Sequence, residues 1–192
     1  MKNIFIILGH SNTDTFSGSL ADRYESGARE SGHEVRRANL GDLSFDPILH
    51  RGYKEIQELE PDLVKIQNDI SWADHIVIIY PNWWNTMPAI LKGMFDRTFL
   101  PNFAFSIDGK SKSARPLLKG KSARVIISSG TYYPFVIRIR FGDYTNEISK
   151  GILGFCGIAP VRITSFGPTE YVTEQKKDQW KQKIHNLGKE GI

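Results

Sequence analysis

The sequence predicts an α/β fold, a doubly wound five-stranded parallel sheet formed by a single domain of residues 1–192. Two observations lead to this prediction. Short apolar runs rich in β-branched residues alternate with longer stretches of helical period along the whole chain, which is typical of parallel strands joined by helices. The runs are solid instead of alternating with polar residues, which indicates strands that are buried on both faces of the sheet.

The predicted strands come in chain order and most end at a turn-forming residue. Gly9 follows the first strand, Pro81 the third and Ser128 the fourth, whereas the second strand is a weaker run. The predicted strands are Ile4–Leu8, a run that starts at Val35, Ile76–Tyr80, Val125–Ile127 and Val161–Phe166.

Helical patterns lie between and after these strands. They cover Phe16–Glu30, Leu63–Trp72, Pro88–Phe99, Thr145–Phe155 and Glu174–Leu187. The segments 41–62 and 101–121 are longer than typical loops, so we expect them to form site walls or contacts between copies of the chain.

Composition excludes several classes of function. The 192 residues include 25 basic and 21 acidic side chains, and the basic ones are scattered, so we expect no nucleic-acid partner. The single Cys156 excludes a CxxC site and favours a reducing, cytoplasmic location. The histidines show no paired ligand spacing, so no metal site is predicted. No apolar stretch approaches the roughly 18 residues of a membrane span.

The loop after the first strand is dense in hydroxyl groups and leads into a predicted helix. His10 to Ser19 contain Thr15, Phe16 and Ser17 just where the helix begins. Free N–H groups at a helix start, with hydroxyl oxygens beside them, form a cradle for phosphate. Simple helix capping is the alternative interpretation. The loop has neither a GxGxxG nor a GxxxxGK[ST] pattern, so a Rossmann dinucleotide site and a P-loop are not indicated.

The loop after the third strand contains two adjacent tryptophans. Trp83 and Trp84 lie between Pro81 and Pro88, and both side chains cannot enter the same core. At least one is therefore expected to be exposed to a ligand or a partner. A hydrophobic dimer patch is the alternative, and it is compatible with a ligand site at the same place.

The loop after the fourth strand has small residues followed by aromatic ones. Ser128, Ser129, Gly130 and Thr131 precede Tyr132–Phe135. Glycine allows the backbone to approach a flat ligand closely. Since the carboxyl ends of parallel strands share one edge of the sheet, the three loops together predict a ligand with a phosphate at one end and a planar ring at the other. A flavin has this outline.

Several segments, in order along nearly the whole chain, resemble the flavodoxin-like NAD(P)H:quinone oxidoreductases, a family that includes ancillary proteins of potassium-efflux systems. The segment from Pro81 to Gly93 is the most specific of them. The matching pieces are His10-Ser11, Thr15-Phe16-Ser17, Pro81-Asn82-Trp83-Trp84, Met87 to Gly93, Asp96-Arg97, Phe103-Ala104-Phe105, Ser128-Ser129-Gly130, Gly151-Ile152-Leu153 and Phe155-Cys156-Gly157.

The resemblance implies a flavodoxin-like fold, FMN or alternatively FAD as cofactor, NAD(P)H as electron donor, and a quinone acceptor bound in the same pocket, usually at a homodimer interface. In this family the first loop holds the flavin phosphate, the second edges the isoalloxazine ring and the third reaches its pyrimidine side. The cofactor-binding residues that it implies are His10, Thr15, Phe16, Ser17, Pro81, Asn82, Trp83, Trp84, Asn85, Ser128, Ser129, Gly130 and Thr131.

The chain departs from the best-known branch of the family at the proton relay. That branch has a Tyr and a His after the fourth strand, whereas this chain has Phe135 or Val136 at the first position and Phe141 at the second. These side chains cannot transfer a proton. Tyr132 and Tyr133 are the catalytic candidates that remain, unless the relay is absent. The chain also ends soon after the last predicted helix, without the C-terminal extension of the longer branch.

Two other functions are compatible with these residues. One is a flavin-binding regulatory partner of a membrane potassium-efflux system, associated peripherally with the transporter. The other is a one-electron carrier, but carriers of this fold tend to be strongly acidic and this chain has a net charge of +4. The sequence therefore favours an enzyme that transfers hydride from NAD(P)H to quinones or similar flat acceptors.

Overall fold

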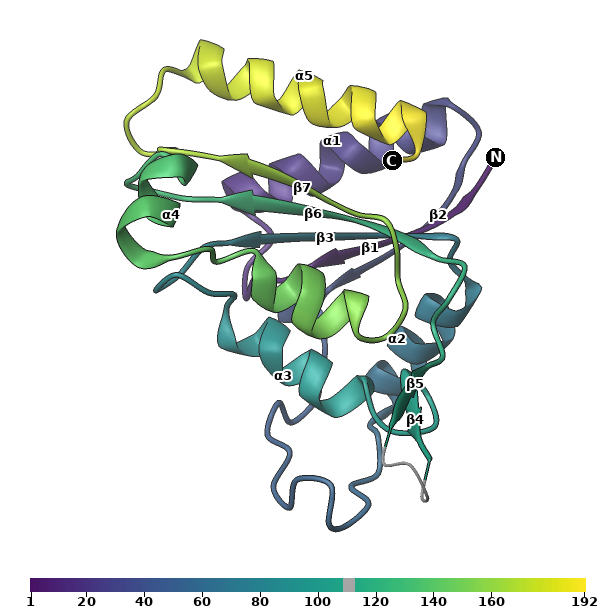
Figure 1. Cartoon of the computed structure of the whole chain (residues 1–192). Coiled ribbons are helices and arrows are strands. Elements are labelled where there is room, and N and C mark those ends of the chain that lie inside the picture. The colour runs from purple at the N-terminus through teal and green to yellow at the C-terminus, as the bar shows by residue number, and fades with distance from the viewer. Residues whose placement is uncertain (109–112) are drawn as a thin grey trace.

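The computed structural model describes residues 1–108 and 113–192, and its centre is a five-stranded sheet (Figure 1). The strand order is β2-β1-β3-β6-β7, and each neighbouring pair is parallel. The strands are β1 (Asn3–Leu8), β2 (Glu34–Asn39), β3 (His75–Pro81), β6 (Ser122–Ser128) and β7 (Val161–Phe166). This confirms the predicted doubly wound α/β fold.

Burial differs between the central and the edge strands. Nearly every residue of β1, β3 and β6 is buried, because helices cover both faces of the sheet. In β2 only Val35 and Ala38 are buried. The edge position of β2 explains the weaker apolar pattern of its residues.

Helices form a layer on each face of the sheet (Figure 1). On one face, α1 (Phe16–Glu30) and α5 (Glu174–Glu190) enclose a core that includes Leu20 and Ile184. On the other face lie α2 (Pro61–Trp72), α3 (Ala89–Thr98) and the π-helix η2 (Glu147–Gly154). A short 3-10 helix, η1 (Leu40–Asp42), follows β2.

The structure corrects the prediction after the fourth strand of the sheet. The predicted loop extends to Phe135, and no helix is predicted between Phe135 and Thr145, whereas the structure has the helix α4 (Pro134–Phe141) here. The sequence does not indicate this helix, because only Ile137 is buried and no apolar stripe of helical period is present. Pro134 at its start and Gly142 just after its end, with φ 90°, were the available signals. The predicted helix 145–155 is the π-helix η2.

The two long segments differ in structure. Segment 101–121 contains a small two-stranded antiparallel sheet of β4 (Phe105–Ile107) and β5 (Ala114–Pro116), which the sequence analysis did not predict. Residues 109–112 of this segment lie outside the described part. Apart from η1 and the start of α2, segment 41–62 has no helix or strand and extends from the body of the molecule (Figure 1).

Arg97 on α3 holds both ends of segment 41–62. Its fully buried guanidinium donates hydrogen bonds to the carbonyl oxygens of Asp46 and Glu58 and forms an ion pair of 2.9 Å with Glu60. One turn earlier, Gly93 packs so closely on Pro47 that an added Cβ would lie 2.4 Å from the proline Cβ. The Lys-Gly and Asp-Arg motifs of α3 thus include two residues that anchor this segment.

Within the described residues, we find no helix that has both the length and the apolar character needed to cross a membrane.

Candidate functional site

Two adjoining cavities lie at the carboxyl ends of the central strands. Their volumes are about 560 and 440 Å³, and they share the lining residues Asn82, Trp84, Gly130 and Thr131. The chain runs from β1 to β2 on one side of β1 and then crosses to β3 on the other side, so the cavities lie near the switch point of the strand order. This is where ligands of open parallel sheets bind.

The first cavity is lined at one end by the start of α1. The side chain of Thr15 caps the helix by accepting a hydrogen bond of 3.1 Å from the N–H of Gly18. In the described part of the chain, the N–H groups of Phe16 and Ser17 have no partner, and both residues line the cavity. Gly18 is required here, because an added Cβ would lie 1.9 Å from the carbonyl oxygen of Thr13. Two free donors and the positive end of the helix dipole form an anion site.

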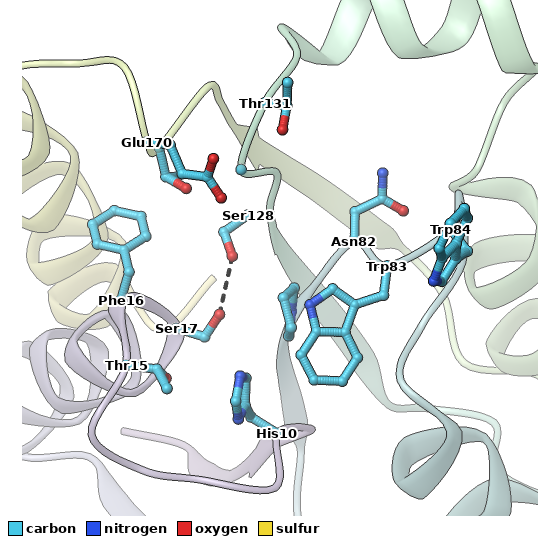
Figure 2. Close-up of a pocket in the computed structure, with 13 residues that line it drawn as sticks. His10, Thr15, Phe16, Ser17, Asn82, Trp83, Trp84, Ser128, Thr131 and Glu170 are labelled. Carbon is cyan, nitrogen blue, oxygen red and sulfur yellow. Dashed lines mark hydrogen bonds between the residues drawn. The ribbon is translucent and has the colours of Figure 1, made fainter.

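Hydrogen bonds connect the loops that surround the first cavity. The Oγ atoms of Ser17 and Ser128 lie 3.0 Å apart (Figure 2). The N–H of Asn82 donates to the carbonyl oxygen of Ser128 at 2.7 Å, and the N–H of Ser129 donates to that of Phe166 at 2.8 Å. These bonds join the carboxyl ends of β3, β6 and β7 to one another. They thereby fix the end of the cavity at the start of α1, the phosphate-type end, relative to the end at Trp83.

The tryptophan loop is a tight hairpin turn. Trp83 and Thr86 exchange two backbone hydrogen bonds of 3.0 Å, and the residues between them, Trp84 and Asn85, have φ values of 53° and 65°. Two consecutive positive φ values define a type I′ turn. The turn directs Trp84 outward, with 99% of its surface exposed, while Trp83 is 44% exposed. This confirms that the two side chains do not share a core.

His10 is a neutral wall residue. Its ring lies edge-on to Trp83 with centroids 5.2 Å apart, and Figure 2 shows both rings beside the cavity. Burial lowers the pKa of His10, and its Nδ1 accepts a hydrogen bond of 2.9 Å from the N–H of Asn12. In the neutral ring the proton is therefore on Nε2, which makes this atom a donor.

The helix α4 forms a wall of the second cavity. Ile137 and Phe141, four residues apart, both line it, and the side-chain amide of Asn85 donates to the carbonyl oxygen of Phe141 at 3.1 Å. Tyr132 lines this cavity too, with its ring 6.3 Å from that of Phe141. Tyr133 lines neither cavity. Among the described residues, Tyr132 is thus the one titratable side chain in this wall.

Two residues of the first cavity were missed by the sequence analysis. Thr169 and Glu170 follow β7, and their N–H groups donate to the carbonyl oxygens of Ser129 and Gly130 at 2.9 and 3.1 Å. An added Cβ at Gly130 would lie 2.6 Å from a carboxylate oxygen of Glu170, so the glycine makes room for this side chain. The signal was available, because the turn after the fifth strand reaches the same sheet edge as the other three loops.

The described residues of the long segments 41–62 and 101–121 contribute nothing to the lining of the two cavities, contrary to one expected role. Tyr53 and Phe105 from these segments instead line a third cavity of about 280 Å³, together with residues of α3 and η2 and the turn after it.

Every implied cofactor-binding residue lines one of the two cavities. The first is lined by His10, Thr15, Phe16, Ser17, Pro81, Asn82, Trp83, Trp84, Ser128, Gly130 and Thr131, and the second adds Asn85 and Ser129. In the described part of the chain, the buried Oγ of Ser129 has no hydrogen-bond partner. Free N–H donors at one end, a glycine backbone, and aromatic walls at the other end fit the phosphate and the planar ring of a flavin.

Comparisons with curated proteins find relatives along nearly the whole chain. A Haemophilus influenzae protein named "Uncharacterized NAD(P)H oxidoreductase" is 29% identical, with 91% of this chain and 88% of the relative covered. The ribosyldihydronicotinamide dehydrogenase [quinone] of Pongo abelii is 28% identical, with 98% of this chain and 93% of the relative covered.

A solved structure and a family model agree with these matches. The crystal structure of a Streptococcus mutans UA159 protein superposes with a TM-score of 0.84 at 29% identity, covering 97% of this chain and 98% of that one. The family model described as flavodoxin-like fold matches residues 2–189. The chain therefore belongs to the flavodoxin-like fold family.

Proposed function

We propose that this protein is a flavin-dependent oxidoreductase that transfers hydride from NAD(P)H, through bound flavin, to quinones or similar flat electron acceptors. The observation that carries the proposal is the pair of adjoining cavities, one with a phosphate-type end and one with aromatic walls, which share Trp84 and Gly130. The names of the relatives, an NAD(P)H oxidoreductase and a quinone-linked dehydrogenase, support the same reaction class.

We propose FMN as the cofactor, with FAD as the alternative. The free N–H groups of Phe16 and Ser17 would hold the phosphate, and the backbone around Gly130 would face the ring. When bound, flavin supplies the hydride-transfer chemistry between donor and acceptor. The part of the protein is to orient the ring, exclude water and bind the acceptor beside it.

The second cavity would hold the acceptor. Its lining consists of neutral side chains, with the rings of Trp84, Tyr132 and Phe141 available to flat ligands. We propose the phenol of Tyr132 as a proton donor to the acceptor, because it is the one titratable side chain among the described residues that line the second cavity. Tyr133 is the weaker candidate, since it lies outside both cavities.

We further propose that the 192 residues act as one domain in a cytoplasmic homodimer. Large apolar side chains near the second cavity are exposed, and a second copy would cover them; they are Trp84, Tyr132, Tyr133, Phe135, Ile139 and Phe141. The reported relatives are named as oxidoreductases, so the role in potassium efflux and the membrane association are not proposed.

The experiment that tests the proposal is the absorption spectrum of the purified protein, followed by chromatography of the released cofactor. A flavin spectrum, release of FMN, and NADH or NADPH oxidation that requires 2-methyl-1,4-naphthoquinone would support it. The two donors are compared at equal concentration, and free flavin without protein is the control. A colourless protein that also fails to bind added flavin would overturn it.

A further inference from the structure

Arg140 is an exposed cation next to the second cavity. It precedes Phe141, whose ring lines this cavity, and its guanidinium carbon lies 5.6 Å from the centre of that ring. Among the described residues, no carboxylate forms a salt bridge with Arg140. The rim of a neutral aromatic cavity therefore carries a positive charge that no carboxylate of the described residues neutralises.

Arg138, on the same helix, is already engaged. Its Nε lies 3.6 Å from a carboxylate oxygen of Asp143, and its guanidinium carbon lies 5.9 Å from the ring centre of Tyr144. Both arginines lie in the last turn of α4, where a cation interacts favourably with the helix dipole. The dipole acts on both, so it does not explain why Arg138 has a carboxylate partner and Arg140 has none among the described residues.

The charges around the two cavities indicate what this cation can bind. The second cavity has no charged side chain in its described lining, while Glu170 lines the first cavity and Glu147 accepts a hydrogen bond of 2.6 Å from Thr86. A flat neutral ring fits the second cavity, and a charged group attached to such a ring has to leave through the rim. An anionic group would meet Arg140 there.

We propose that Arg140 binds the phosphates of the electron donor and makes the protein selective for a phosphorylated nicotinamide dinucleotide over the uncharged dihydronicotinamide riboside. This inference rests on the proposed function. The nicotinamide ring is flat, and the dinucleotide carries a pyrophosphate one ribose away from it, whereas the riboside ends at that ribose. The two reported relatives are named after these two kinds of donor.

The test compares donors in three forms of the flavin-loaded enzyme: wild type, Arg140→Gln and the matched control Arg138→Gln. With 2-methyl-1,4-naphthoquinone as acceptor, kcat/KM is measured for NADH, NADPH and dihydronicotinamide riboside. We expect Arg140→Gln to lower kcat/KM for both dinucleotides roughly fivefold to tenfold, mainly through KM, because one charge-assisted contact is lost. The riboside rate and all rates of Arg138→Gln stay near wild type.

Salt gives a second readout. Raising the ionic strength from low to physiological values should raise KM for NADH in wild type and in Arg138→Gln, and much less in Arg140→Gln. An equal loss of activity with riboside and dinucleotides in Arg140→Gln, a wild-type preference for the riboside, or an equal effect of Arg138→Gln would overturn the proposal.

A failure of the proposed function can be distinguished from a failure of the proposed role of Arg140. If the wild type oxidises none of the three donors, tryptophan fluorescence titrations with NADH and dihydronicotinamide riboside measure the same discrimination without turnover, since Trp84 lines the cavity. Tighter binding of NADH than of the riboside that is lost in Arg140→Gln supports the role of Arg140. Equal binding of NADH by the two arginine variants and the wild type overturns it.

Discussion

Ser17 and Ser128 hydrogen-bond to each other through their hydroxyl groups, 3.0 Å apart, and so join the first turn of α1 to the end of β6. Both residues line the first cavity and are almost completely buried. The pair places a hydroxyl beside the two free N–H groups of the helix start. It therefore makes Ser17 the side chain through which the proposed phosphate site is most directly tested.

Replacing Ser17 by Ala should weaken flavin binding roughly fivefold to tenfold, the value of about one hydrogen bond. The measurement is the dissociation constant from quenching of flavin fluorescence. Ser19→Ala is the control on the same helix, because its hydroxyl donates to the carbonyl oxygen of Phe16 and Ser19 does not line the cavity. Equal affinities in both variants and the wild type would place the phosphate elsewhere.

Replacing Trp84 by Ala should lower flavin affinity and kcat/KM by at least about tenfold, on the order of 1.4 kcal/mol, because the ring shared by both cavities is lost. Thermal stability should change little, since the side chain is almost fully exposed. Trp84→Phe keeps an aromatic ring and should retain most of the activity. Light scattering on each variant checks that the oligomeric state is matched. Wild-type affinity and turnover in Trp84→Ala would contradict the site.

Asn85 gives a test of the hairpin turn. Asn85→Gly and Asn85→Ala both lose the hydrogen bond to the carbonyl oxygen of Phe141, but only Gly accepts a φ of 65° without strain. Asn85→Ala should therefore be less stable than Asn85→Gly by about 1 kcal/mol in urea unfolding. If the two variants have the same free energy of unfolding, the turn does not hold the left-handed conformation in solution.

Arg97→Met should destabilise the protein by roughly 2–3 kcal/mol, because the buried guanidinium serves two carbonyl oxygens and a carboxylate that would lose their donors. The loss of stability is smaller than for a fully buried pair, because Glu60 is 30% exposed and water can solvate its carboxylate in the variant. Urea unfolding measures the loss, and Lys92→Met, on the exposed side of α3, is the control. Limited proteolysis should cut segment 41–62 faster in Arg97→Met. An unchanged free energy of unfolding and an unchanged cleavage rate would show that the contacts of Arg97 with segment 41–62 are dispensable.

His75 predicts how stability depends on pH. Burial, followed by the nearby Lys2 and Arg124, lowers the pKa of this histidine from 6.5 to about 3. The unfolded chain therefore binds a proton below pH 6.5 that the folded chain takes up only near pH 3. The His75 contribution is complete above pH 6.5 and is lost as pH falls toward 3, by at most about 1.4 kcal/mol per pH unit.

The matched variant for this prediction is His75→Phe, which keeps a ring but cannot bind a proton. Its free energy of unfolding should fall less steeply than that of the wild type between pH 7 and pH 5, the range in which the unfolded-state group titrates. Parallel pH profiles of the two proteins would contradict the prediction. The variant also loses the contact of 2.8 Å between Nδ1 and the hydroxyl of Ser122, which lowers its stability at every pH.

The sequence by itself determined the layered sheet and the position of the site. Solid apolar runs such as Ile4–Leu8 and Ile76–Tyr80 mark buried parallel strands, because only such strands exclude polar residues from both faces. Parallel strands end at one edge, so the order of strands and helices along the chain is enough to bring the loops at His10, Trp83 and Ser128 together. The exposure of at least one tryptophan followed from chain stereochemistry.

Only the tertiary structure decided which side chains complete the site. Glu170 reaches the first cavity because Gly130, forty residues earlier in a different loop, leaves room for it. Tyr132 faces the second cavity and Tyr133 does not, since α4 begins immediately after them and sets their directions. Arg97 reads in sequence as one more helix cation, and becomes a buried clamp only when segment 41–62 folds over it. Such contacts join distant parts of the chain, so they cannot be predicted from the local periodicity of the sequence.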